Sequence, residues 1–198
     1  MLSQKAKPED VSLVEYLIAH LIHKGELNAG DLASFKPGIC NRLDRNTSGI
    51  VAAGKTTKGL QQLSEAFKQR ILGKYYLCIV KGNVDKRALI KGYLYKDEKT
   101  NKVTISRTET KDSLPIETEY IPVCSNGNVT LLKIHLLTGR SHQIRAHLAS
   151  IGHPLIGDFK YGDKKINQEM KQRFGLKDQL LHCTEVVFPR DMKTCRNL

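Results

Sequence analysis

The sequence lacks a long apolar segment, a signal peptide and any internal repeat, and each absence excludes a class of protein. No apolar run approaches the roughly 20 residues that a membrane-spanning helix needs. The N-terminus has no apolar core of the kind that a secretory signal carries. We therefore expect a cytoplasmic protein without membrane association. With no low-complexity linker to divide them, the 198 residues are expected to form one domain, residues 1–198.

Paired cysteines and zinc-binding patterns are also missing. The chain has five cysteines, scattered and never spaced as C-x-x-C: Cys40, Cys78, Cys124, Cys183 and Cys195. This pattern favours reduced thiols over a disulfide framework or a cysteine zinc site. His142 and His147 lie close together, but no glutamate stands between them and H-E-x-x-H is absent. We therefore expect no metal site.

Positive charge, in contrast, is abundant. Lysine and arginine number 32 against 20 acidic residues, which gives a formal net charge of +12. Such an excess attracts polyanions. RNA or DNA is favoured over an anionic membrane as the partner, because no basic amphipathic helix with a large aromatic face is present.

The first third of the chain contains a helix, a loop and a short apolar run. Ser12 and Glu15 fit a capping box, and the apolar spacing after them predicts a helix that ends near His23. Gly25–Gly38 is predicted to be a loop that ends in a Pro-Gly turn. The apolar run Ile50–Ala53 is predicted to be a short buried strand.

A second helix and several strands are expected further along the chain. Thr57 can cap a helix with apolar residues at helical spacing, namely Leu60, Leu63, Phe67 and Ile71. Tyr75–Val80 is predicted to be a strand from its aromatic and β-branched content. Residues 83–128 are predicted to contain short strands and polar turns, and to end in a hairpin turn at Ser125–Asn128. Val129–Leu136 and Leu180–Phe188 are the last predicted strands.

A third helix is expected after the turn Thr138–Arg140. Ser141 is the predicted cap, and Gly152 is the predicted end. Its inward residues should be Ile144, Leu148 and Ile151. Because turns rather than crossover helices follow most strands, the pattern favours an α+β fold with a mixed, largely antiparallel sheet flanked by helices.

Two polar segments bounded by glycine are candidates for chemistry, and the first is Asn41–Gly49. It reads N-R-L-D-R-N-T-S-G, so that Asp44 lies between Arg42 and Arg45. Asp44 is either a surface charge balanced by its neighbours or a carboxylate held for catalysis. The residue pattern alone leaves both readings open.

The second segment is Leu137–Gly157, and it contains Arg145. That arginine follows the inward Ile144, so it is rotated by about 100° from the buried face of the helix. It can lie at the edge of the core and reach a carboxylate from another segment. A solvated helix face is the equally open alternative.

Three motifs in the right order resemble those of one family. N-R-L-D-R-N-T-S-G, followed by I-V-A-A-G-K-T, resembles the H-R-L-D-R-D-T-S-G signature and strand of RluA-type pseudouridine synthases. K-Y-Y-L-C-I-V-K-G resembles that family's K-x-Y-x-x-x-V-x-G segment. T-G-R-S-H-Q-I-R-A-H-L-A-S-I-G-H-P-L-I-G-D, with Tyr161-Gly162 just after it, resembles the third motif. The resemblance covers residues from about 12 to 188.

The resemblance implies a pseudouridine synthase fold and an enzyme that isomerises uridine in ribosomal or transfer RNA without a cofactor. By this resemblance Asp44 is the catalytic carboxylate, acting as nucleophile or base, and Arg145 pairs with it. Tyr76, rather than Tyr75, matches the tyrosine that packs against the target base. The residues expected to bind RNA are Arg42, Arg45, Arg140 and His142. Of these, Arg42 matches a residue that fills the vacated stack or holds phosphate.

The chain also departs from the family pattern. Asn41 and Asn46 stand where the family usually has histidine and aspartate. The usual N-terminal strand with its K-P-x-G turn and the small basic RNA-binding module are missing, so we expect a catalytic domain truncated at its N-terminus, acting as a monomer. A catalytically silent RNA-binding module on the same fold is the alternative. A glycosidase-like hydrolase ranks last, because neither motif contains a second acid.

Overall fold

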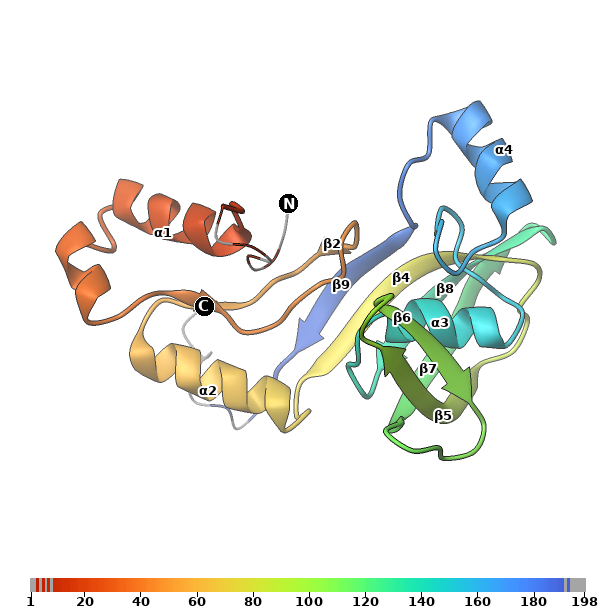
Figure 1. Ribbon diagram of the computed structural model, residues 1–198, viewed down its shortest axis with the longest axis horizontal. Helices are drawn as coiled ribbons and strands as arrows, with labels where there is room; N and C mark the ends of the chain where they lie inside the picture. Colours follow the sequence, from red (N-terminus) through yellow and green to blue (C-terminus); the bar gives the residue numbers. More distant parts are fainter. Residues whose placement is uncertain (1–2, 4, 6, 8, 191, 193–198) are drawn as a thin grey trace. The chain divides into compact units, whose positions relative to one another are not determined.

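The computed structural model describes residues 3, 5, 7, 9–190 and 192. Its contacts group into two compact units, which are described separately. The first unit holds Met1–Asn46, Ile50–Leu72 and Phe188–Leu198, and the second holds Thr47–Gly49 and Gly73–Val187. Figure 1 follows the chain through both units in colour. The single catalytic domain expected from the sequence stays a prediction.

The first unit begins with the helix α1, Leu13–His23, whose capping box is confirmed. The backbone N–H of Ser12 donates to the Glu15 carboxylate at 2.9 Å. The hydroxyl of Ser12 also donates to that carboxylate, and these hydrogen bonds lower the pKa of Glu15 to about 2. The predicted loop after α1 is partly wrong, because it contains the short 3-10 helix η1, Ala29–Ala33.

The short strands β1, Gly38–Ile39, and β3, Ala53–Gly54, form an antiparallel pair in the first unit. The predicted buried strand Ile50–Ala53 is therefore wrong for most of its length. Ile50 is 41% exposed, and only Ala53 belongs to a strand. Because the carbonyl of Ile50 accepts from the Asn41 side chain, this run is tied to a side chain rather than to a neighbouring strand there.

The helix α2, Thr57–Lys68, is present, but its predicted ends need correction. Its cap is Thr56, whose hydroxyl oxygen accepts from the Gly59 N–H at 3.1 Å, and not Thr57. The helix ends at Lys68, before Ile71, which was counted in its apolar spacing and is 49% exposed. An apolar residue one turn past a helix end still fits the helical period, so spacing alone extended the prediction too far.

The second unit is built on a seven-stranded sheet (Figure 1). Its strands are β2 Ser48–Gly49, β4 Gly73–Lys81, β5 Ala88–Asp97, β6 Lys102–Ser106, β7 Leu114–Ser125, β8 Val129–Leu136 and β9 Leu181–Val187. The strand order is β2-β9-β4-β8-β7-β5-β6. The pair β2–β9 is parallel and all other neighbours are antiparallel, which confirms the predicted mixed, largely antiparallel sheet.

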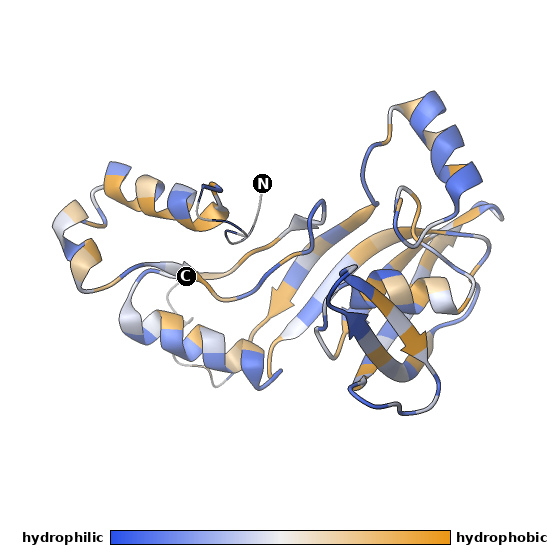
Figure 2. Ribbon diagram, viewed as in Figure 1, coloured by the Kyte–Doolittle hydropathy of each residue, from blue (hydrophilic) through white to orange (hydrophobic). Residues whose placement is uncertain are grey.

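One face of this sheet packs against the helix α3, Gln143–Ser150. Burial alternates along β8, as expected for a strand with one face in the core. Figure 2 shows the mixture of apolar and polar residues along these strands and the mainly polar helix α4, Lys164–Phe174. One buried cluster joins Ala146 of α3 to three strand residues, namely Leu94, Val103 and Ile116. The core therefore fixes α3 against β5, β6 and β7.

The start of α3 differs from the prediction. The cap is His142 in the left-handed conformation (φ 54°), and it makes no side-chain capping bond, whereas Ser141 was the expected cap. The side chain of Gln143 instead accepts from the backbone N–H of Arg140 at 3.0 Å and orders this turn. Ile144 and Leu148 are buried as predicted, but Ile151 lies at the C-cap and is 37% exposed.

Candidate active site

Asp44 lies on a segment of the first unit with no regular secondary structure. The amide of Asn41 ties the start of this segment to its end, since it donates to the Ile50 carbonyl at 3.2 Å and accepts from the Ala52 N–H at 2.7 Å. Asp44 is half-buried, and the flanking Arg42 and Arg45 are exposed. Asn41, which departs from the family's usual histidine, thus has a structural role in this segment.

The same motif ends in the second unit, where β2 pairs with β9. Gly49 has a φ of 119°, and a Cβ at this position would lie 2.2 Å from the Cys183 carbonyl oxygen. Beside it, Gln179 donates to the Thr47 hydroxyl at 3.2 Å. The glycine that closes the motif is therefore required for β2 to approach β9.

Tyr76 is buried in β4, with 7% of its surface exposed. Tyr75 points to the opposite face of the sheet, where it stacks on His135 with ring centroids 4.5 Å apart. The pairing of β4 with β9 shifts register between the two tyrosines. The two neighbouring tyrosines thus have different surroundings, and the one chosen by resemblance is the buried one.

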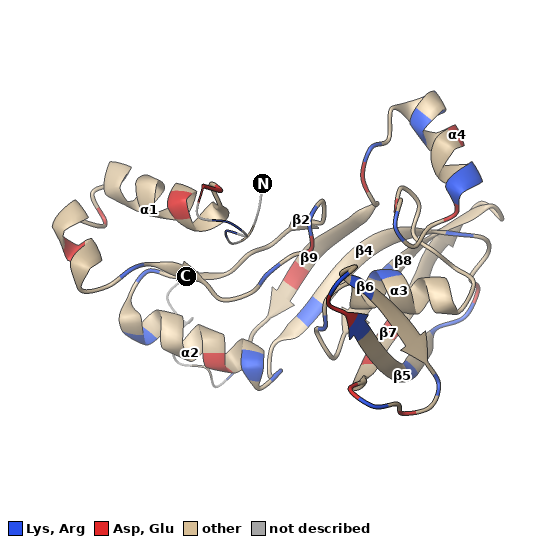
Figure 3. Ribbon diagram, in the orientation of Figure 1, with Lys and Arg blue, Asp and Glu red and all other residues tan. Residues whose placement is uncertain are grey.

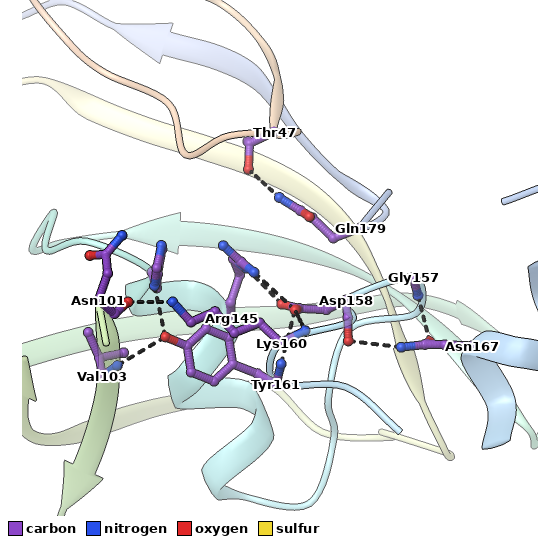
Figure 4. A network of polar contacts seen from close by, with 11 residues as sticks. Thr47, Asn101, Val103, Arg145, Gly157, Asp158, Lys160, Tyr161, Asn167 and Gln179 are labelled. Atoms are coloured by element: carbon purple, nitrogen blue, oxygen red, sulfur yellow. Dashed lines mark hydrogen bonds and ion pairs between the residues drawn. The ribbon is translucent and has the colours of Figure 1, made fainter. Parts of the chain in front are cut away.

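Arg145 is buried in α3 and forms an ion pair with a carboxylate of another segment (Figure 4). Its Nε and Nη2 donate to the two oxygens of Asp158 at 2.7 and 3.0 Å. Asp158 is fully buried, and its Oδ1 also accepts from the backbone N–H groups of Lys160 and Tyr161. Burial alone would raise the pKa of Asp158, but the Arg145 charge and these hydrogen bonds together lower it.

The ring of Tyr161 completes the surroundings of Arg145. The guanidinium carbon lies 5.2 Å from the ring centroid, within the range of a cation–π contact. The Tyr161 hydroxyl accepts from the Val103 N–H at 3.0 Å and lies 2.8 Å from Nδ1 of His142. This hydroxyl therefore links the start of α3 to β6.

Gln143 organises the turn that carries Arg140. Its Oε1 accepts from the Thr138 hydroxyl at 2.9 Å and from the Arg140 N–H at 3.0 Å. Its Nε2 donates to the Glu117 carbonyl at 3.0 Å and to the Thr118 hydroxyl at 3.1 Å. This buried amide thus makes four hydrogen bonds, which hold the turn against β7.

His147, one turn further along α3, is a buried imidazole. Its Nδ1 lies 3.0 Å from the Thr118 hydroxyl. Burial lowers the pKa of His147 to about 4, despite a hydrogen bond to the Lys91 backbone that favours the charged form. His147 is therefore neutral at physiological pH, and it is part of the core rather than a surface contact.

Most of the predicted site residues lie in the second unit. Tyr76, Arg140, His142 and Arg145 all belong to it, whereas Arg42, Asp44 and Arg45 belong to the first. Arg145 does reach a carboxylate from another segment, and in the second unit that carboxylate is Asp158. The pairing of Arg145 with Asp44 stays a prediction.

The sequence reasoning assigned no role to Asp158, Tyr161 or Gln143. A signal for Asp158 was present, since an acid directly follows the apolar Leu155-Ile156-Gly157. That apolar segment runs beside β4, where the Ile156 N–H donates to the Ile79 carbonyl at 2.9 Å. An acid carried into the core by such a segment requires a cationic partner.

The described residues contain neither a cluster suited to a metal ion nor a membrane-spanning helix. Across the described ranges, no three His, Cys, Asp or Glu side chains come together in a way that could hold a metal ion. Residues 9–190 likewise include no helix both long and apolar enough to cross a bilayer.

Figure 3 shows that α4 carries both signs of charge. Its basic residues are Lys164, Lys165, Lys171 and Arg173.

Comparison with known proteins identifies the family. The family model for RNA pseudouridylate synthase matches residues 5–150. The chain is 35% identical over 156 residues to ribosomal large subunit pseudouridine synthase C of Haemophilus ducreyi, covering 76% of this chain and 47% of that protein. It is 36% identical to an uncharacterised RNA pseudouridine synthase of Mycoplasma genitalium, covering 79% of this chain and 48% of the relative. The chain thus spans about half the length of the curated relatives that it matches.

Solved structures show the same fold. Human RNA pseudouridylate synthase domain containing 4 superposes with a TM-score of 0.75 at 18% identity, covering 96% of this chain and 78% of that one. Human RNA pseudouridylate synthase domain containing 1 gives a TM-score of 0.65 at 24% identity, covering 77% of this chain and 64% of that one. The fold, the family model and the curated relatives agree, and the chain belongs to the RluA-type family of RNA pseudouridine synthases.

Proposed function

We propose that this chain isomerises uridine to pseudouridine in RNA. One observation carries the proposal: the family match over residues 5–150 takes in Asp44, Tyr76 and Arg145. The reaction breaks the C1′–N1 glycosidic bond and forms a C1′–C5 bond, while C5 loses a proton and N1 gains one. The product has the same atoms and oxidation state as the substrate, so the reaction consumes no oxidant and no donor group.

In this proposal Asp44 is the catalytic carboxylate, acting either as nucleophile or as base. Only an ionised carboxylate serves in either role, and a neighbouring guanidinium favours the ionised form. Arg145 supplies that guanidinium. Tyr76 offers a ring against the target base, which replaces part of the stacking lost when the nucleotide leaves its helix. The half-buried position of Asp44 and the buried position of Arg145 suit these roles.

The RNA of the large ribosomal subunit is the substrate that we favour. Curated relatives carry the names ribosomal large subunit pseudouridine synthase C and D, the latter in Borreliella burgdorferi. Contacts to RNA phosphates are expected from Arg42, Arg45, Arg140 and His142, and the net charge of +12 supports them. We expect a monomer that acts in the cytoplasm.

The test is the conversion of uridine in defined RNAs. The protein is incubated with large-subunit ribosomal RNA and, separately, with unmodified transfer RNA, and the nucleosides of each digest are separated and quantified. Pseudouridine in the ribosomal arm alone is the expected result, with RNA mass unchanged. Pseudouridine only in transfer RNA would contradict ribosomal RNA as the substrate and would support the proposed reaction. Binding without conversion would indicate a silent RNA-binding module, and release of free uracil would indicate a hydrolase.

A further inference from the structure

Arg145 is restrained on two sides by residues of its own unit. Asp158 takes the Nε–Nη2 edge of the guanidinium through two short hydrogen bonds, and the Tyr161 ring lies against it (Figure 4). A guanidinium held in this way keeps one orientation, because rotation would break both charge-assisted hydrogen bonds. The direction of Arg145 is therefore set within the second unit.

The carboxylate that holds Arg145 is itself rigidly placed. The carbonyl of Asp158 accepts from the Asn167 amide at 2.8 Å, and Asn167 also accepts from the Gly157 N–H at 2.8 Å. Asn167 is 1% exposed. At Gly162, a Cβ would lie 2.2 Å from the backbone carbonyl oxygen of Asp158, so the chain packs closely against the Asp158 backbone. The contacts that hold Asp158 in place thus come from residues between Gly157 and Asn167.

A buried ion pair of this kind is weak evidence for stability, since apolar side chains of similar volume often stabilise a core as well. Its value here is geometric. Because Asp158 occupies the Nε–Nη2 edge, a second carboxylate such as that of Asp44 can meet only the other edge of the guanidinium. In the pairing proposed above, Asp158 would therefore determine which edge of the Arg145 guanidinium is offered to a second carboxylate.

We propose that Asp158, together with the ring of Tyr161, is a positioning residue for isomerisation and acts through Arg145. This inference rests on the proposed function. It assigns Asp158 no contact with RNA. Loss of either support therefore lowers kcat, and loss of Asp158 leaves RNA affinity unchanged, since a misdirected catalytic group affects the chemical step.

The first test measures single-turnover conversion, RNA affinity and melting temperature for three variants and one control. Asp158→Asn and Tyr161→Leu should each lower turnover by about 10- to 100-fold, and the RNA affinity of Asp158→Asn should stay within about threefold of the parent. The two Tyr161 variants both lose the hydroxyl beside His142, so the difference between them reports the ring alone. Tyr161→Phe keeps the ring and should stay within about threefold in turnover. Asp112→Asn, the same chemical change at an exposed turn, is the control and should match the parent.

The second test asks whether Asp158 acts through Arg145. Asp158→Asn is measured alone and in an Arg145→Lys background, where the planar fork is already lost. If Asp158 acts through Arg145, it should cost less than about threefold in that background, because interacting residues are not additive. Equal losses in both backgrounds would mean a general structural role and would overturn the proposal.

The outcomes separate this inference from the proposed function. A parent protein that forms no pseudouridine in either RNA would overturn both. An active parent with near-parental turnover in Asp158→Asn would overturn the positioning role alone. If Asp158→Asn does not fold, the Tyr161 pair decides, and equal turnover of the leucine and phenylalanine variants would sink the proposal.

Discussion

Asp44 lies on a segment without regular structure, whereas Arg145 lies in the middle of a buried helix. The Asp44 segment is held by the Asn41 amide and has exposed arginines on both sides of the carboxylate. Around Arg145 the α3 side chains of Gln143 and His147 are both buried and hydrogen-bonded. The same proposed reaction thus draws on two differently built regions.

The difference has an energetic consequence. A half-buried carboxylate on a loop can be changed to an amide of nearly the same size with little effect on packing. Removal of a buried charge costs more, because the oppositely charged partner is left buried without a counter-charge. Substitutions near Asp44 should therefore separate activity from stability, and substitutions near Arg145 should couple the two.

The largest effect is expected for Asp44→Asn. The amide has nearly the same size but cannot act as an anionic nucleophile or as a base, so conversion should fall by at least about 1,000-fold. The free energy of unfolding should change by less than about 1 kcal/mol. RNA affinity should hold or rise slightly, because a negative charge near phosphate has been removed.

The measurement combines conversion of ribosomal RNA, urea unfolding and RNA affinity on the same preparation. Asp112→Asn provides the matched control, since it makes the same change at an exposed turn. Near-parental conversion by Asp44→Asn would mean that this carboxylate is only a surface charge between Arg42 and Arg45. A variant that fails to fold would contradict the contrast between the two regions.

Arg145→Ala should lower activity and stability together. It leaves the Asp158 carboxylate buried without the guanidinium, and breaking such a pair costs about 3–5 kcal/mol of unfolding free energy. Conversion should fall as well, measured under conditions where the variant is folded. Arg173→Ala is the matched control, because its exposed pair with Glu169 on α4 is worth less than about 1 kcal/mol. Equal stability losses in the two variants would remove the energetic contrast.

Stability should also depend on pH through His147. Its pKa is about 4 in the folded protein and near 6.5 in the unfolded chain, so between these values the unfolded chain binds more protons. The stabilisation is complete above pH 6.5 and is lost as the pH falls towards 4. From pH 7 to pH 5 the free energy of unfolding should fall by about 2 kcal/mol from this residue.

Urea unfolding at several pH values checks this expectation against His147→Asn, which does not titrate. Protonation of carboxylates such as Asp158 also lowers the free energy of unfolding in acid, and it does so in both proteins. The difference between parent and variant therefore gives the contribution of His147 alone. Parallel pH profiles for the two proteins would show that His147 does not contribute.

Local patterns predicted much of the fold, and long-range contacts account for the misses. The alternation in Val129–Leu136 and the Ser12–Glu15 capping box depend on neighbouring residues, so both were predicted correctly. The Ile50–Ala53 strand was wrong because the Asn41 side chain, nine residues away, binds its backbone. The sequence left open whether Arg145 reaches a carboxylate or faces solvent, and only the packing of α3 identifies Asp158 as its partner.

The smallest effect is expected for Asn41→Ala, which tests how the Asp44 segment is held. The alanine removes a donor to Ile50 and an acceptor from Ala52, both at partly exposed sites where water can substitute. The free energy of unfolding should therefore fall by only about 1 kcal/mol. Conversion should fall by more than this stability loss explains, because a loosened loop no longer holds Asp44 in place. Asn126→Ala, which removes another loop amide that accepts from backbone N–H groups, is the control for stability and should leave conversion unchanged. If Asn41→Ala instead cost as much stability as Arg145→Ala, the Asp44 segment would be part of the buried framework, and the contrast between the two regions would be wrong.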